Sequence, residues 1–261
     1  MSPIEVTIIV ATSGPSAAVE DAVSAALGQT ETSPHVVLVG PAPHSLDRQP
    51  SDRVVVLPAG PSITQSEAWN LGLRTARTPW VAFLAERDLW APDHLRTLAA
   101  ACEADHADFA YSASWAIDEQ RRLRFFRAVP PPSDLARELL TRDAIGTPSS
   151  VLARRELLDR SGGFDEWLTA LAPWDLWIRW SRMAQGAMVS AATAAGTQSD
   201  GDAGVAKREL KELRRRYDGD AKDAGLRFGQ GVGSEPSGPA PGPEVRPPWL
   251  VPRRGVGRRS T

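Results

Sequence analysis

The chain has 261 residues, of which 42% are hydrophobic and 24% are charged, and this composition is ordinary for a soluble globular protein. Its formal net charge of −2 gives no overall field that would select nucleic acid or a membrane as a partner. The single cysteine, Cys102, excludes an intramolecular disulfide and an all-cysteine metal site, and it favours a reducing cytoplasm. Neither a signal peptide nor an apolar run of the roughly 18 residues that a membrane span needs is expected.

Short apolar or β-branched runs alternate with amphipathic segments through the first hundred residues. Strands are predicted at residues 6–11, 35–39, 53–57 and 80–84. Helices are predicted at residues 17–29, 66–77 and 92–103, with Ser16 as the N-cap of the first. Strands that alternate with helices favour an α/β fold with a mostly parallel sheet and helices on both faces.

The second part of the chain is more irregular. It predicts strands at residues 108–114 and 149–152, a hairpin-like segment at 115–126, and helices at 134–140, 154–161 and 174–183. From about residue 191 the sequence becomes small and polar, with a charged helix at about 205–217 and a segment rich in Gly, Pro and Arg beyond Gly219. We expect a domain at residues 1–190 and a low-complexity tail at 191–261 whose last part is disordered.

The chain is basic near its C-terminus, where Glu244 is accompanied by five arginines: Arg246, Arg253, Arg254, Arg258 and Arg259. A solvated tail is the favoured interpretation, because charge runs are usually solvated. Contact with a polyanion or peripheral contact with a membrane is the alternative.

The rest of the chain is organised around residues 78–95, with the sequence TPWVAFLAERDLWAPDHL. A buried strand ends there at Ala85, and Glu86, Arg87 and Asp88 follow it. Ligands of open α/β sheets bind beyond the carboxyl ends of the strands, and carboxylates suit a divalent cation beside a phosphate-bearing ligand. Glu86 and Asp88 are therefore candidate metal ligands, although the charge of Arg87 opposes a cation. In the alternative interpretation, Asp88 caps the following helix and Glu86 is solvated.

Several motifs resemble, in this order, a family 2 glycosyltransferase of the GT-A fold. They are VTIIVATSG (6–14), AVSAALGQT (22–30), HVVLVG (35–40), AWNLGLRTA (68–76), PWVAFLAERDLWAPDHL (79–95), IGTPSSVLARRELLDRSGGFDE (145–166) and PWDLWIRW (173–180). The resemblance implies a single GT-A-type domain with a nucleotide-sugar half at about 1–100 and an acceptor half at about 101–190. It implies transfer of a hexose from a UDP-, GDP- or TDP-sugar to a hydroxyl of a carbohydrate, lipid or natural-product acceptor.

The resemblance also implies a Mg²⁺ or Mn²⁺ ion on a DxD-type carboxylate pair, a grip on the nucleoside and a general base. The sequence departs from the family at all three places. Gly40-Pro41 replaces the aspartate pair that holds the nucleoside, and Ala85 and Arg87 take the two DxD positions. Ala172-Pro173 replaces the Glu-Asp pair that supplies the base.

Two candidates remain for the diphosphate. Glu86 and Asp88 keep an acidic pair that is shifted by one residue, and such a shift reverses the face of a strand. Alternatively, Arg87 neutralises the diphosphate itself, as a bidentate phosphate binder can.

For the general base, the nearby carboxylates are Asp175, Asp165 and Glu166, with Asp175 and Asp165 as the candidates. A structural role on its helix is the alternative for Asp175. The resemblance implies that Thr12 and Asn70 contact the donor, whereas local hydrogen bonds are the alternative for both. Three tryptophans at helical spacing could stack on a sugar but are more typical of a core: Trp174, Trp177 and Trp180.

Two functional hypotheses follow. The first is an active transferase, with a shifted metal site or with Arg87 in place of the metal. The second is a catalytically inactive binding or scaffold protein of the same fold, which the loss of three acidic sites favours. The fold cannot choose between them, because function depends on the site. The transferase is preferred as the description at the level of the family.

Overall fold

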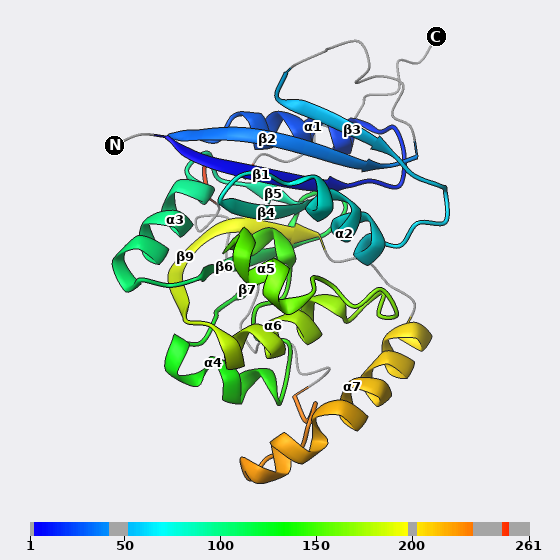
Figure 1. Ribbon diagram of the computed structural model, residues 1–261, viewed down its shortest axis with the longest axis vertical. Coiled ribbons are helices and arrows are strands. Elements are labelled where there is room, and N and C mark those ends of the chain that lie inside the picture. The colour runs from blue at the N-terminus through cyan, green and yellow to red at the C-terminus, as the bar shows by residue number, and fades with distance from the viewer. Residues whose placement is uncertain (1–2, 42–51, 198–202, 232–246, 251–261) are drawn as a thin grey trace.

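The computed structural model describes residues 3–41, 52–197, 203–231 and 247–250. In these segments the chain forms a nine-stranded sheet with helices on both faces (Figure 1). The strand order is β3-β2-β1-β4-β8-β6-β9-β5, and β7 pairs with β6 outside this path.

The first part of the chain builds the parallel side of the sheet, as the sequence predicts. Its elements are β1 (Ile4–Ala11), α1 (Ala17–Leu27), β2 (Thr32–Gly40), β3 (Val54–Pro58), α2 (Gln65–Thr75) and β4 (Trp80–Ala85). All three pairings among β3, β2, β1 and β4 are parallel. The register pairs Ala11 of β1 with Ala85 of β4, so both strands end side by side at their carboxyl ends.

The second part of the chain mixes the two directions. Its elements are β5 (Leu89–Trp90), α3 (His94–Asp105), β6 (Phe109–Ile117), β7 (Leu123–Arg127), α4 (Pro132–Leu139), the 3₁₀ turn η2 (Pro148–Ser150), β8 (Val151–Arg154), α5 (Arg155–Ser161), α6 (Ala172–Met183), β9 (Gly186–Thr197) and α7 (Ala203–Asp223). The strand β8 runs antiparallel to β4 and β6, whereas β6 and β9 are parallel. The parallel pattern predicted from the sequence therefore holds for the first four strands, and the complete sheet is mixed.

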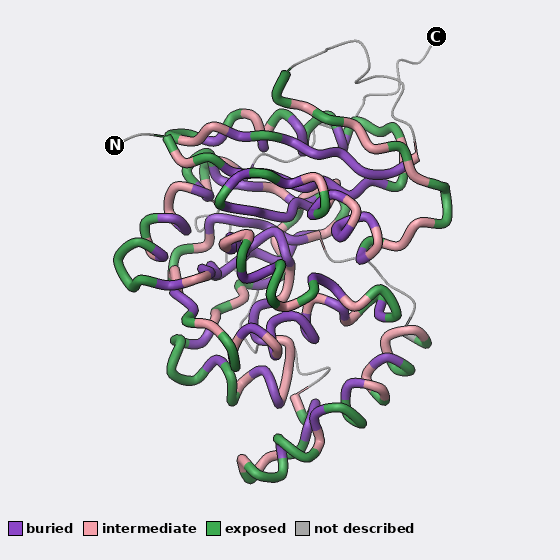
Figure 2. Tube along the Cα trace, in the orientation of Figure 1, coloured by how far each residue is buried: buried purple, intermediate pink, exposed green. Residues whose placement is uncertain are grey.

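Side chains of alternate strand positions enter two separate hydrophobic cores, as the period of two along a strand requires. Ile8 and Val10 of β1 pack on the side of α1 and α3, whereas Ile9 and Ala11 pack on the side of α2, α5 and α6. Figure 2 shows the central strands buried between these helices. The tryptophans of α6 (Trp174, Trp177 and Trp180) are all buried in the second of these cores, which confirms their interpretation as core residues.

The folded region extends further than residue 190, and this corrects the boundary expected from the sequence. The expected boundary falls inside β9, whose small residues resemble a low-complexity segment in the sequence. Small side chains are required in this strand because neighbours approach closely: a Cβ on Gly186 would meet the ring of Phe109, and one on Gly196 would meet Thr147.

The helix α7 is also longer than expected and belongs to the core. Its Leu213 and Tyr217 are buried, and so is Phe228, which stacks on Trp174 with a ring-centroid distance of 5.2 Å. The segment from 219 to 231 is therefore packed rather than disordered. The five arginines at 246–259 lie outside the described residues. None of the described helices combines the length and the apolar composition that crossing a membrane would require.

Candidate functional site: a cavity at the carboxyl ends of β1 and β4

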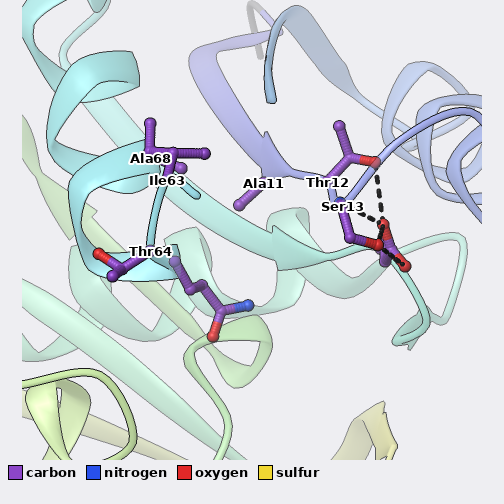
Figure 3. A pocket seen from close by; sticks show the side chains of 8 residues that line it. Ala11, Thr12, Ser13, Ile63, Thr64 and Ala68 are labelled. Atoms are coloured by element: carbon purple, nitrogen blue, oxygen red, sulfur yellow. Dashed lines mark hydrogen bonds between the residues drawn. The ribbon is translucent and has the colours of Figure 1, made fainter. Parts of the chain in front are cut away.

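A cavity of about 260 Å³ opens where β1 and β4 end, in front of the N-terminus of α2 (Figure 3). Its lining comes from the end of β1, the start of α2 and the residue after β4: Ala11, Thr12, Ser13, Ile63, Thr64, Gln65, Ala68 and Glu86. The sequence predicts a ligand at this edge of the sheet. Its walls carry hydroxyl groups, an amide and one carboxylate.

The carboxylate of Glu86 is held by the loop after β1. Its Oε2 accepts hydrogen bonds from the backbone N–H of Ser13 at 2.9 Å and from the Thr12 hydroxyl at 2.9 Å, and its Oε1 lies 3.1 Å from the Ser13 hydroxyl (dashed lines in Figure 3). Only 15% of its side chain is exposed. Glu86 is therefore an oriented acceptor at the cavity wall and not the solvated residue of the alternative interpretation.

Local sequence fixes both walls of the cavity. Thr64 and Glu67 form a capping box at the start of α2, in which each side chain bonds the backbone of the other residue. On the other wall, a Cβ at position 40 would collide with the carbonyl of Thr12. Gly40 at the end of β2 thus lets the ends of β1 and β2 approach each other. This close approach leaves no room for a side chain at position 40.

Asp88 turns away from Glu86. Its Oδ2 accepts from the Thr147 hydroxyl at 2.6 Å and its Oδ1 from the backbone N–H of Thr197 at 2.7 Å. The residue is 4% exposed, and burial raises the pKa of its carboxyl, while the hydrogen bonds from Thr147 and Thr197 oppose this rise. Asp88 does not cap the following helix, because α3 begins at His94 with Asp93 at the N-cap position.

The arrangement of these groups does not fit a divalent cation. Glu86 bonds the β1 side of β4 and Asp88 bonds the opposite side, so the two carboxylates do not converge. Between them, the guanidinium of Arg87 lies 3.6 Å from Glu86 Oε1 and 2.8 Å from Glu119 Oε1. Within the segments that the structure describes, no group of three or more His, Cys, Asp or Glu residues is placed to hold a metal ion.

Asn70 lies outside the cavity and joins two elements. Its Nδ2 donates to the carbonyl of Phe164 at 2.8 Å and to Glu166 Oε1 at 2.9 Å, and its Oδ1 accepts from the N–H of Phe164. These bonds tie α2 to the loop after α5 and favour the local role given as the alternative. Thr12, in contrast, lines the cavity, so its expected contact with a donor stays a prediction that the geometry allows.

The two candidate bases lie in an ion-pair network with α7. Asp175 is buried, and its carboxylate accepts from Arg179 Nε at 2.8 Å, Tyr217 Oη at 2.7 Å and Arg216 Nη1 at 3.3 Å. Asp165 accepts from the same Arg216 at 2.7 Å. Both carboxylates are occupied by protein donors, which favours the structural role over that of a base.

Sequence reasoning missed several lining residues, among them Ser13, Thr64 and Gln65. The signal for the last two was present, because the sequence Thr64-Gln65-Ser66-Glu67 is a capping box that marks where a helix begins. Ser13 had no signal of its own. Its role depends on the parallel register that brings the ends of β1 and β4 together.

The comparisons with known proteins agree with this fold. Residues 49–162 match the sequence model of the family described as glycosyl transferase family 2, which confirms the resemblance inferred from the motifs. No curated protein sequence matches the chain.

Solved structures show the same fold at low sequence identity. S. aureus TarS is 16% identical with a TM-score of 0.59 over 82% of this chain and 44% of its own. A structure of S. aureus TarS 1-349 in complex with UDP-GlcNAc is 16% identical with a TM-score of 0.58 over 76% of this chain and 60% of its own. The mannosyltransferase PcManGT from Pyrobaculum calidifontis, in complex with GDP-Man and Mn²⁺, is 17% identical with a TM-score of 0.54 over 84% of this chain and 64% of its own. The chain thus spans less than two thirds of each of these structures.

Proposed function

We propose that this chain, which shares its fold with family 2 glycosyltransferases, transfers a hexose from a nucleoside diphosphate donor to a hydroxyl of an acceptor. The observation that carries the proposal is the cavity at the ends of β1 and β4, with the oriented carboxylate of Glu86 in its wall. Ligands of α/β sheets bind at this edge. Two structures with the same fold are complexes with UDP-GlcNAc and with GDP-Man, and they support a nucleotide-sugar as the ligand.

The lining suits a nucleoside rather than a phosphate group. Glu86 supplies a negative charge, which repels phosphate but accepts hydrogen bonds from ribose hydroxyls or from the N–H groups of a base. Thr12, Ser13 and Thr64 add hydroxyls, and Gln65 adds an amide that can both donate and accept. In this proposal Glu86 binds the nucleoside, because Gly40-Pro41 has no carboxylate that could do so.

Arg87 is the group that we assign to the diphosphate. Its side chain is 52% exposed and is paired with the exposed Glu119. Such a surface pair contributes little, about 0–1 kcal/mol, so a diphosphate can replace Glu119 at small cost. The guanidinium binds phosphate oxygens in a bidentate manner. The acceptor oxygen bonds to the anomeric carbon as the bond from that carbon to the diphosphate oxygen breaks, and the hydroxyl proton passes to solvent. Arg87 stabilises the negative charge that grows on the leaving diphosphate, without a metal ion.

A second candidate function is an inactive protein that binds the same donor. The observation that favours it is the state of the candidate bases: Asp165 and Asp175 both pair with Arg216, and Ala172-Pro173 offers no carboxylate. Such a protein would hold a nucleotide-sugar in the same cavity and would not release its nucleotide.

Release of nucleoside diphosphate separates the two functions. We would incubate the protein with UDP-, GDP- and TDP-hexoses and a panel of carbohydrate and lipid acceptors, in Mn²⁺ and in EDTA. The transferase predicts release that depends on an acceptor, persists in EDTA and falls about 10²-fold in Arg87→Gln. Arg124→Gln, which alters an exposed arginine on β7, is the matched control. Donor binding without release would support the inactive protein, and release abolished by EDTA would contradict the role of Arg87.

A further inference from the structure

A second and larger cavity, of about 580 Å³, lies between α7 and the loop that precedes α6. We call it the α7 pocket. Its lining consists of Trp167, Leu168, Thr169, Val205, Arg208, Glu209, Glu212 and Arg216. The volume lies within the usual range of small-molecule sites, roughly 300–1,000 Å³.

Trp167 is the unusual residue of this pocket, because its side chain is 91% exposed. An exposed tryptophan on the rim of a cavity offers a flat apolar face that nothing in the described chain covers, and sugar rings stack on such faces. The backbone of the loop is fixed: the N–H of Trp167 donates to Asp165 Oδ1 at 2.9 Å. The Trp167 side chain is thus carried by an ordered turn.

Most charged side chains of the pocket already pair with other groups of the protein. Glu209 accepts four hydrogen bonds from the loop, and Glu212 and Arg216 pair with each other at 3.0 Å. Arg208 is exposed, and among the described residues it has no hydrogen bond or ion pair. The charge that the pocket offers to a ligand is therefore positive.

The α7 pocket adjoins the first cavity through α2. The hydroxyl of Ser66 donates to the carbonyl of Leu168 at 2.7 Å. Ser66 directly follows Gln65, which lines the first cavity, while Leu168 lines the α7 pocket. This hydrogen bond links the segments of α2 and of the loop before α6 that line the two cavities.

We propose that the α7 pocket binds the glycosyl acceptor, and that this acceptor is a carbohydrate bearing a carboxylate or phosphate group. A sugar ring stacks on Trp167, and the anionic group pairs with Arg208. The inference rests on the proposed transferase function, and it selects the carbohydrate among the classes of acceptor. It also assigns the sugar platform to Trp167 in place of the buried Trp174, Trp177 and Trp180.

The test is binding of the full chain to a printed array of glycans in three classes: neutral, carboxylate-bearing and phosphate-bearing. We expect retention of anionic glycans, with the class that binds identifying the charged group. Trp167→Ala should lower the affinity about tenfold, and Arg208→Gln should remove the preference for anionic over neutral glycans. Phe126→Ala and Arg124→Gln, which alter an exposed aromatic residue and an exposed arginine on β7, should change nothing.

Two results would overturn the inference: retention of no anionic glycan by the folded protein, or retention that Trp167→Ala and Arg208→Gln leave unchanged. Titration of UDP and GDP into the same preparation separates this failure from failure of the proposed function. Nucleotide binding that persists while glycan binding fails leaves the donor cavity in place and removes the acceptor assignment alone.

Discussion

At the scale of single residues, Glu86 and Asp88 show how two carboxylates in one short segment acquire different properties. Glu86 is held at the wall of a cavity by Thr12 and Ser13, so its charge faces the space that a ligand would fill. Asp88 is buried on the other side of β4, and burial raises the pKa of its carboxyl. The first is suited to ligand binding, while the second links β4 to η2 and β9.

His94 gives a prediction about stability and pH. Burial lowers the pKa of its imidazole to about 3, from the ordinary value of 6.5. Because the folded pKa lies below the unfolded one, this histidine contributes stability that is complete above pH 6.5 and is lost as the pH falls towards 3. The slope of this loss is at most about 1.4 kcal/mol per pH unit.

The variant His94→Phe removes this titration and leaves the Thr193 hydroxyl without its partner, at a cost of about 1 kcal/mol at pH 7. Urea unfolding at pH 7.5, 6 and 5 measures both effects. We expect the free energy of unfolding to fall less steeply with pH in the variant than in the wild type. Parallel pH profiles for the two proteins would contradict the assignment.

Two tryptophans give a matched pair of predictions. Trp177 is fully buried, so Trp177→Ala should lower the free energy of unfolding by about 3–5 kcal/mol. Trp167 is almost fully exposed, so Trp167→Ala should change it by less than about 0.5 kcal/mol. Chemical denaturation of both variants tests the burial. A large loss in Trp167→Ala would mean that this side chain packs on the protein in solution.

At the scale of elements, α7 and α6 depend on each other. The helix α6 has no side-chain cap of its own at Leu171. Glu209 of α7, only 8% exposed, instead accepts from the backbone N–H groups of Thr169, Ala170 and Leu171 and from the Thr169 hydroxyl. A carboxylate at this place also complements the positive end of the helix dipole of α6.

The variant Glu209→Ala should therefore lower the free energy of unfolding by about 2–4 kcal/mol, because it removes four part-buried hydrogen bonds to a charged acceptor. Lys211→Ala, at an exposed position of the same helix, should change it by less than about 0.5 kcal/mol. Thermal melts followed by circular dichroism compare the two. Equal melting temperatures would show that Glu209 does not stabilise the loop that leads into α6.

The sequence predicted most elements because their patterns are strong. Alternating apolar positions and clear caps identified the helices up to α6 and most of the strands, though not the short β5. Ser16 caps α1, as predicted, by accepting from the N–H of Val19. It missed β9, because a strand built of Ala, Gly and Thr resembles a low-complexity linker. It missed the packing of α7, whose buried side chains are few among many charges and become visible only when Tyr217 meets Asp175.

At the scale of the whole molecule, the fold places two pockets on either side of α2 and the loop before α6. The first lies at the ends of β1 and β4 and is built from segments at 11–13, 63–68 and 86. The second uses α7, which lies along the outside of the domain in Figure 1. Sequence reasoning placed the first pocket, because the ends of parallel strands meet at one edge. It could not place the second, because that pocket depends on how α7 docks.

The same contrast explains the candidate site residues. Glu86 and Thr12 line the first cavity, as strand ends require, and Arg87 directly follows Glu86 in the chain. Asn70 and Asp175 were drawn from motif positions, but long-range partners that the sequence does not show engage them: Phe164 for the first and α7 for the second. Motif order predicted the fold, whereas the function of each polar residue depended on its neighbours in space.

The central claim is that the cavity beside Glu86 holds the nucleoside of a sugar donor. Isothermal titration of UDP, GDP and TDP into the wild type, Glu86→Gln and the control Glu5→Gln, all in EDTA, tests it most directly. We predict that one nucleotide binds the wild type and Glu5→Gln equally, and that Glu86→Gln weakens this binding about 10- to 100-fold, since a hydrogen bond to a charged group is lost. A folded protein that binds none of the three, or a Glu86→Gln variant with wild-type affinity, would contradict the account.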